Sequence, residues 1–150
     1  MTVHRRTKKK KRAIIGWREW VALPELGVDR IKAKIDTGAR TSALHALQPE
    51  TFQRKGEPYV RFRVHPVQKH RHPEILCEAL LLDSREVKNS GGHIEHRFVI
   101  ETPLQIGKRV FSVEITLTDR APMGFRMLLG RTAVRRRFLV NPGSSFLLSE

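Results

Sequence analysis

The stretch Ile31-Lys32-Ala33-Lys34-Ile35-Asp36-Thr37-Gly38-Ala39 decides the fold, because an apolar-leaning strand ends there in a turn that begins with an acid. The Thr37 hydroxyl can form a hydrogen bond to a partner loop. Gly38 tolerates unusual backbone angles and lets backbone N–H groups approach the Asp36 carboxylate. Taken alone, the tetrapeptide 36–39 also fits a plain turn between two strands.

A second signal lies far downstream, in Met127-Leu128-Leu129-Gly130-Arg131-Thr132-Ala133-Val134. The apolar run predicts a short strand that ends at Gly130. The segment that follows predicts the one helix of the chain, over residues 131–136.

The two features together, in this order, resemble the retropepsins, the single-domain aspartic peptidases. The blocks 36–46, 116–120 and 127–131 are similar to the bacterial family called ATP-dependent zinc proteases, which is retropepsin-like and is often encoded near ATP-grasp glutamate ligases that modify a ribosomal protein. The resemblance covers about residues 13–148. It implies an all-β fold, a closed retropepsin-like (acid protease) barrel with one short C-terminal helix.

The resemblance also implies roles for residues of the matching blocks. The catalytic turn would comprise Asp36, Thr37 and Gly38; substrate would contact Ala39, Arg40 and His45; and Asp119, Gly130 and Arg131 would support the turn. A role for His45 in bonding the backbone remains open beside its role in the cleft.

Position 40 departs from the retropepsin pattern, in which an acid often follows the Ala and pairs with the Arg of the Gly-Arg motif. Here Arg40 and Arg131 are both cations, so the supporting ion pair must be rebuilt, with Asp119 as the nearest candidate. Arg40 either pairs with Asp119 or Glu114, or faces the cleft and binds a substrate carboxylate through its planar fork of donors.

Hydrolysis by aspartate requires two carboxylates that share one proton and activate one water. The chain has one Asp-Thr-Gly and no internal repeat, so a twofold homodimer would have to supply the second Asp36. The expected function is an aspartic-type peptidase acting on acidic or glutamate-modified ribosomal protein tails. A glutamate ligase is a further expected partner.

Two other functions stay open. One is a non-catalytic adaptor with the same barrel, which acts with a glutamate ligase or the ribosome. The other is contact with ribosomal RNA through the basic N-terminus, where seven Lys and Arg fall within the first twelve residues. Like charges at this density predict a disordered tail over residues 1–12, ahead of a peptidase domain over residues 13–150. Net charge is +14, a balance that favours polyanionic partners.

Composition fits one cytoplasmic domain. The chain has 150 residues, of which 39% are hydrophobic, and no apolar stretch long enough to cross a membrane. Cys77 is the single cysteine, which fits a reducing compartment and predicts a buried thiol.

Short strands separated by Pro and Gly predict the all-β class. Strands are expected over residues 13–23, 28–35, 41–46, 59–64, 75–82, 95–101 and 108–117, with a polar loop over 67–73 and a turn at 90–92. Asp36 and Gly130 are farther apart than in the simplest retropepsins. The extra chain is expected between residues 47 and 95, with a hairpin over the active site there or at 90–96.

Zinc and ATP, which the name of the resembling family mentions, find no support in the residues, so neither a metal nor a cofactor is expected. His-Glu-x-x-His is absent, His93-Ile94-Glu95-His96 has the wrong spacing, and there is no Walker-type loop. The loop histidines His65, His70 and His72 are expected to be solvated.

Overall fold

Six strands close into a barrel, in the order β2-β3-β10-β4-β9-β8. The computed structural model describes residues 11–88, 91–92, 94–119 and 124–149. Within them the strands are β1 (Ala13–Gly16), β2 (Arg18–Leu23), β3 (Val28–Asp36), β4 (Ser42–His45), β5 (Leu47–Arg54), β6 (Glu57–Val64), β7 (Ile75–Lys88), β8 (Ile94–Ile106), β9 (Arg109–Thr118), β10 (Met127–Gly130) and β11 (Phe138–Asn141). The pairing of Ala22 with Gln105, between β2 and β8, closes the ring. The predicted closed retropepsin-like barrel is confirmed.

Alternating side chains explain why these segments form a barrel wall. In β2 every second residue is buried, and β3 buries Ile31, Ala33 and Ile35 while the residues between them face outward. The barrel core consists of aliphatic side chains from all six strands, with Ile31, Leu44, Leu104, Ile115 and Leu129 fully buried. Burying these side chains supplies the main favourable term in folding.

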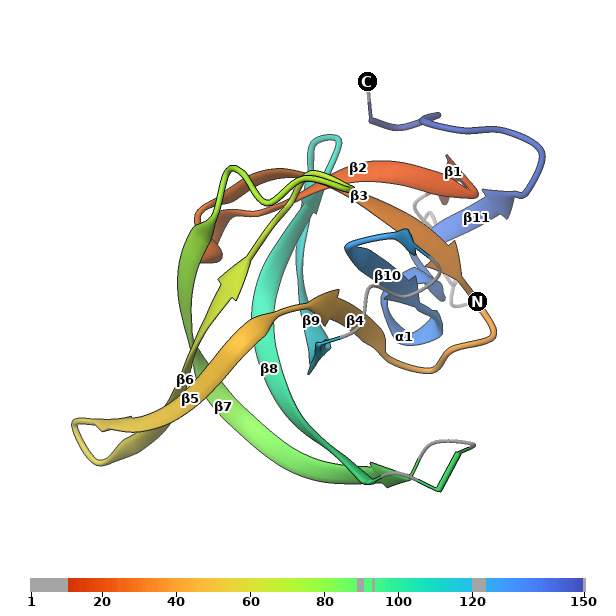
Figure 1. Ribbon diagram of the computed structural model, residues 1–150. Helices are drawn as coiled ribbons and strands as arrows, with labels where there is room; N and C mark the ends of the chain where they lie inside the picture. Colours follow the sequence, from red (N-terminus) through yellow and green to blue (C-terminus); the bar gives the residue numbers. More distant parts are fainter. Residues whose placement is uncertain (1–10, 89–90, 93, 120–123, 150) are drawn as a thin grey trace, which may run out of the picture.

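Beyond the barrel, β8 continues into a second region of sheet with β7, β6 and β5 (Figure 1). β7 and β8 form a long, curved hairpin, paired from Leu81↔Ile100 to Lys88↔Ile94. This region is the extra chain that the spacing predicted between residues 47 and 95.

The strand β10 positions the site, because it lies between β3 and β4. It pairs parallel with β3, with Gly130 opposite Asp36, and antiparallel with β4. The predicted strand-to-helix junction is therefore beside the Asp-Thr-Gly turn, although 94 residues separate Asp36 from Gly130 along the chain. The helix α1 (Arg131–Val134) is shorter than predicted and ends at Arg135, whose backbone is no longer helical.

Other boundaries also differ from the predictions. The predicted strand 13–23 is two strands: β1 pairs with β11, and β2 pairs with β3. β5 was not predicted, since its burial shows no alternation. Both strands of the β7–β8 hairpin extend beyond the ranges predicted for them, residues 75–82 and 95–101. The loop over 67–73 is confirmed, and part of the predicted turn at 90–92 and residues 1–10 of the predicted tail lie outside the described residues.

Cys77 confirms the expected buried thiol. It is 1% exposed and donates to the Leu26 carbonyl at 3.3 Å. Burial raises the pKa of its thiol to about 12, so it is a poor nucleophile at neutral pH. In the described part of the chain, no helix has the length and apolar character needed to cross a bilayer.

Candidate active site

The Asp36 carboxylate is held by its own turn and remains half-exposed. Its Oδ1 atom accepts hydrogen bonds from the backbone N–H groups of Gly38 at 3.1 Å and Ala39 at 3.3 Å. A Cβ atom at position 38 would lie 3.3 Å from the same oxygen, a tight contact that favours glycine there. Among the described residues, no Lys, Arg or His lies within ion-pair distance of Asp36. The described part of the chain thus presents an oriented acid with no cation paired to it.

The segment that follows β10 fixes the turn from one side. The Arg131 backbone N–H donates to the Ala39 carbonyl at 2.7 Å, and that of Thr132 donates to the Arg40 carbonyl at 3.0 Å. The Arg131 side chain donates to the Thr37 carbonyl at 3.0 Å. These three bonds let Arg131 and its neighbour support the turn without an acidic partner.

Gly130 is required by the close approach of β10 to the chain that leaves the turn. A Cβ atom there would lie 2.5 Å from the carbonyl carbon and 2.7 Å from the carbonyl oxygen of Thr41. The Gly130 N–H donates to the Ser42 hydroxyl at 3.0 Å, a buried contact. The sequence analysis did not identify Ser42, whose small side chain allows β10 and the segment that leaves the turn to pack closely.

Thr37 and Gly38 are both exposed at the tip of the turn. The Thr37 hydroxyl has no hydrogen-bond partner within the described chain, while its carbonyl is bound by Arg131. The hydroxyl is therefore free to form a bond to a second turn brought against it.

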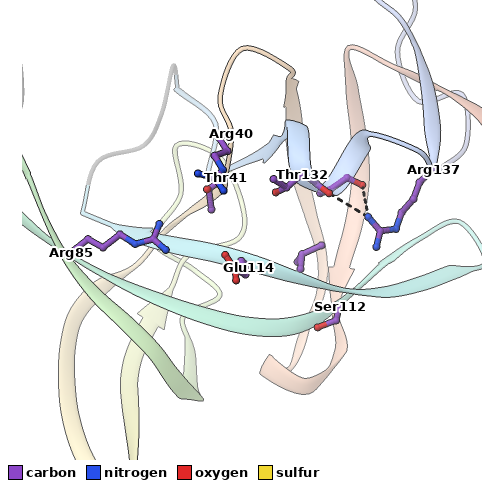
Figure 2. Close-up of a pocket in the computed structure, with 9 residues that line it drawn as sticks. Arg40, Thr41, Arg85, Ser112, Glu114, Thr132 and Arg137 are labelled. Atoms are coloured by element: carbon purple, nitrogen blue, oxygen red, sulfur yellow. Dashed lines mark hydrogen bonds between the residues drawn. The ribbon is translucent and has the colours of Figure 1, made fainter.

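Arg40 is exposed and lines a cavity of about 380 Å³ next to the turn. Figure 2 shows Arg85 reaching from β7 toward Glu114 on β9, beneath Arg40 and Thr41. Arg137 closes the far side, where it donates to the Thr132 and Ala133 carbonyls. The long β7–β8 hairpin thus contributes a cation to the space beside the Asp36 turn.

The expected ion pair of Asp119 with Arg40 or Arg131 is not among the ion pairs of the described residues, and Arg40 forms none with Glu114 either. Asp119 is exposed at the end of β9, and its backbone carbonyl accepts from His45 instead. Arg85 and Arg137 were missed as pocket residues because no local motif marks them.

His45 is 7% exposed and is bonded on both ring nitrogens. Its Nδ1 atom accepts from the Arg126 guanidinium at 2.8 Å, so the Nε2–H donates to the Asp119 carbonyl at 3.0 Å. Burial, together with the Arg126 charge, lowers the pKa of His45 and keeps the ring neutral. It lines a second cavity of about 500 Å³, whose lining does not include the Asp36 turn.

The loop histidines do not gather around a metal site. His65 is buried and contacts the Glu74 carboxylate at 3.0 Å, contrary to the solvated position expected for it, while His70 and His72 are exposed. Within the described residues no group of three or more potential ligands is arranged to hold a metal ion.

A closed six-stranded barrel that presents an Asp-Thr-Gly turn beside a Gly-Arg strand end defines the retropepsin-like class. Residues 14–150 match the RimB-like family, described as "Retropepsin-like aspartic endopeptidase RimB", and the chain belongs to this family. The match agrees with the retropepsin-like family that the sequence resembles. The words zinc and ATP in the name of that family have no counterpart in this description.

Longer proteins contain the same domain. The chain is 49% identical, over 91% of its length, to a protein of Shewanella halifaxensis named "Probable alpha-L-glutamate ligase", and 48% identical to one of the same name from Desulfotalea psychrophila. It spans about 30% of the length of these relatives. A crystal structure of a Legionella pneumophila protein of unknown function superposes with a TM-score of 0.76 at 28% identity, and covers 92% of this chain and 99% of the other.

Proposed function

We propose that the chain is an aspartic-type peptidase that hydrolyses peptide bonds with the Asp36 carboxylates of two copies. The observation that carries this proposal is the state of Asp36. It is oriented by two backbone N–H groups, half-exposed, and without a cation among the described residues.

One carboxylate per chain needs a partner, which a twofold dimer would supply. Two carboxyls about 3 Å apart cannot both ionise, so the pair would hold one proton between them. The ionised carboxyl would take a proton from water as the water attacks the carbonyl carbon, and the protonated carboxyl would donate to the carbonyl oxygen. The exposed Thr37 hydroxyls would bond across the axis and keep the two turns together.

The pocket beside the turn favours an acidic substrate. Arg40 and Arg85 line it from opposite elements, and Glu114 is the one acidic residue among the described residues of its lining. Arg85 also pairs with Asp83 at 2.8 Å, whereas Arg40 has no ion-pair partner among the described residues. Guanidinium groups bind carboxylates with two parallel hydrogen bonds. A glutamate-modified protein tail in the cytoplasm suits this pocket, and the ligase names of the longer relatives support a functional link with glutamate ligation.

The proposal is tested by incubating glutamate-extended peptides with the wild type and with Asp36→Asn, and by following the products by mass spectrometry. Cleavage is expected only with the wild type, because the amide cannot act as the base. Cleavage by Asp36→Asn at the wild-type rate would exclude Asp36 from the chemistry.

The role of Arg40 is tested by comparing acidic and neutral peptides of the same length. Arg40→Ala should reduce kcat/KM about tenfold more on acidic peptides, since one charged contact is lost. Arg135→Ala removes an exposed arginine that does not line the pocket and is the matched control. Equal losses on both peptides would refute a role for Arg40 in substrate choice.

A second candidate function is a non-catalytic adaptor for a glutamate ligase. The specific observation that favours it is that relatives with ligase names carry this domain as about 30% of a longer chain. If the chain is an adaptor, neither the wild type nor Asp36→Asn should cleave any peptide. Both should bind the ligase with the same affinity.

A further inference from the structure

A second groove lies on the outer face of β2 and β3, at a distance from the Arg40 pocket. Its cavity of about 660 Å³ is lined by Trp17, Arg18, Trp20, Arg30 and Lys32, and by the loop over residues 66–70 that follows β6. We call it the Trp20 groove. Both tryptophans of the chain line it.

All the charged residues that line the Trp20 groove, among those described, are basic. No acidic residue of the described chain lines it, whereas Arg18, Arg30, Lys32 and Lys69 do. Arg30 and Lys32 have neither a hydrogen-bond nor an ion-pair partner among the described residues. The groove therefore concentrates positive charge that the rest of the described structure does not neutralise.

Aromatic rings hold these cations in place. The Arg30 guanidinium lies 4.0 Å from the centre of the Trp20 ring, and the Lys32 ammonium 5.2 Å from it. Such contacts stabilise a cation over a ring and restrict its side chain in advance of binding. An anion that enters the groove would thus meet donors that have already lost part of their rotamer freedom.

A cluster of arginines and aromatic rings on the β5–β6 hairpin is similar, but its charges are neutralised by an acid. Arg54 and Arg61 lie 5.2 and 4.8 Å from the Phe52 ring, but both contact Glu78, at 2.5 and 3.1 Å. The hairpin cluster contains its own anion. No acidic residue of the described chain does the same in the Trp20 groove.

We propose that the Trp20 groove binds an acidic peptide segment, with Arg30 and Lys32 as the principal contacts for its carboxylates. Alternation along β3 places these two residues on the same face of the strand as Asp36. At about 3.3 Å per residue, they lie about 20 and 13 Å from it along the strand. A bound acidic chain would occupy the groove with residues four to six positions from the bond at Asp36. This link to cleavage rests on the proposed function, whereas binding itself does not.

The aromatic geometry favours an acidic peptide over single-stranded RNA. RNA recognition needs free ring faces on which bases stack. The Trp20 ring is stacked on Phe146 at 5.8 Å and also covered by Arg30, and Trp17 contacts Phe125 edge-on at 6.0 Å. The rings therefore support cations rather than offer stacking platforms.

The binding test uses the Asp36→Asn protein, so that the peptide stays intact whether or not the wild type is a peptidase. Octaglutamate is titrated while tryptophan fluorescence is recorded, since both indoles report on the groove. Arg30→Gln/Lys32→Gln in the same background should weaken binding about tenfold, the loss of two charged contacts. The matched control Arg54→Gln/Arg61→Gln removes two equally ring-supported charges and should change binding less than about twofold.

Any of three results would overturn the proposal: octaglutamine binding as tightly as octaglutamate, equal losses in the two double variants, or an oligouridylate of the same length displacing octaglutamate from the groove at lower concentration. A wild type that cleaves nothing, with octaglutamate binding as predicted, would refute the proposed peptidase and leave the binding site standing.

Discussion

Glu19 and Asp36 are two carboxylates at the same end of the β2–β3 strand pair, and their surroundings differ completely. Glu19 is 0% exposed, and its two oxygens accept from the backbone N–H groups of Gly16, Leu147, Leu148 and Ser149 and from the Ser149 hydroxyl, at 2.7–3.1 Å. Asp36 is half-exposed and accepts only from its own turn.

This difference separates a structural acid from one that is free to act. Burial would raise the pKa of Glu19, but hydrogen bonds from Gly16, Ser149 and Leu147 outweigh it and lower the pKa. The charge of Glu19 is thus fully used to anchor the C-terminal segment to β2. The second oxygen of Asp36 accepts no bond from the described residues, so it remains available to a water or a partner carboxyl.

The largest effect on folding is expected from Glu19→Gln. An amide accepts fewer hydrogen bonds and turns its NH₂ group toward backbone donors, which leaves several of them unpaired. At about 1–3 kcal/mol for each unsatisfied group, we expect the free energy of unfolding to fall by about 3–5 kcal/mol. Urea denaturation followed by circular dichroism measures it.

The control for this variant is Glu25→Gln, which removes the same charge from an exposed position on the 3-10 turn at Pro24–Leu26. It should change stability by less than about 0.5 kcal/mol. Similar losses in the two variants would mean that Glu19 is not the anchor described.

Gly130→Ala tests the surroundings of the second carboxylate, Asp36, which lies opposite Gly130 of β10. The added Cβ atom would overlap the Thr41 backbone at 2.5 Å, which no side-chain rotation can relieve. We expect a loss of about 2–3 kcal/mol in the free energy of unfolding, typical of overpacking. Gly143→Ala is the control, because its Cβ atom would make only an ordinary 3.5 Å contact. Unchanged stability in Gly130→Ala would refute the close approach of β10 to the turn.

A smaller effect is expected from pH. Because the folded-state pKa of Glu19 lies below its ordinary value of 4.5, its contribution is fully present above that value and is lost as pH falls through the folded pKa. The stability difference between wild type and Glu19→Gln should therefore be constant from about pH 7 to 5 and shrink toward pH 3. A difference that grows on acidification would contradict the assigned direction.

The same pair of acids shows how far sequence reasoning reaches. Asp36 could be identified because a local motif, strand then Asp-Thr-Gly, carries its chemistry, and because the Gly130 segment resembles a known partner motif. The local sequence around Glu19, between Arg18 and Trp20, suggests an exposed charge. Three of its four backbone donors come from residues 147–149, almost a full chain length away, so no local pattern could reveal its burial.

A similar limit applies to the strands. The barrel strands were predicted because alternation follows from one buried face, as in β2 and β3. β5 has almost no buried face, so its sequence shows no alternation. It is a strand because its backbone pairs with β6. Arg85 gains its place beside Arg40 only through the curvature of the long β7–β8 hairpin, a property of the whole sheet.

The most direct test of a shared Asp36 pair is a subunit-mixing experiment. Wild type and Asp36→Asn are unfolded together at equal concentration, refolded, and assayed for peptide hydrolysis against wild type treated alone at the same total concentration. If each active centre needs one Asp36 from each of two subunits, random pairing leaves about one quarter of the activity. About one half would show that each chain acts by itself and would contradict the account.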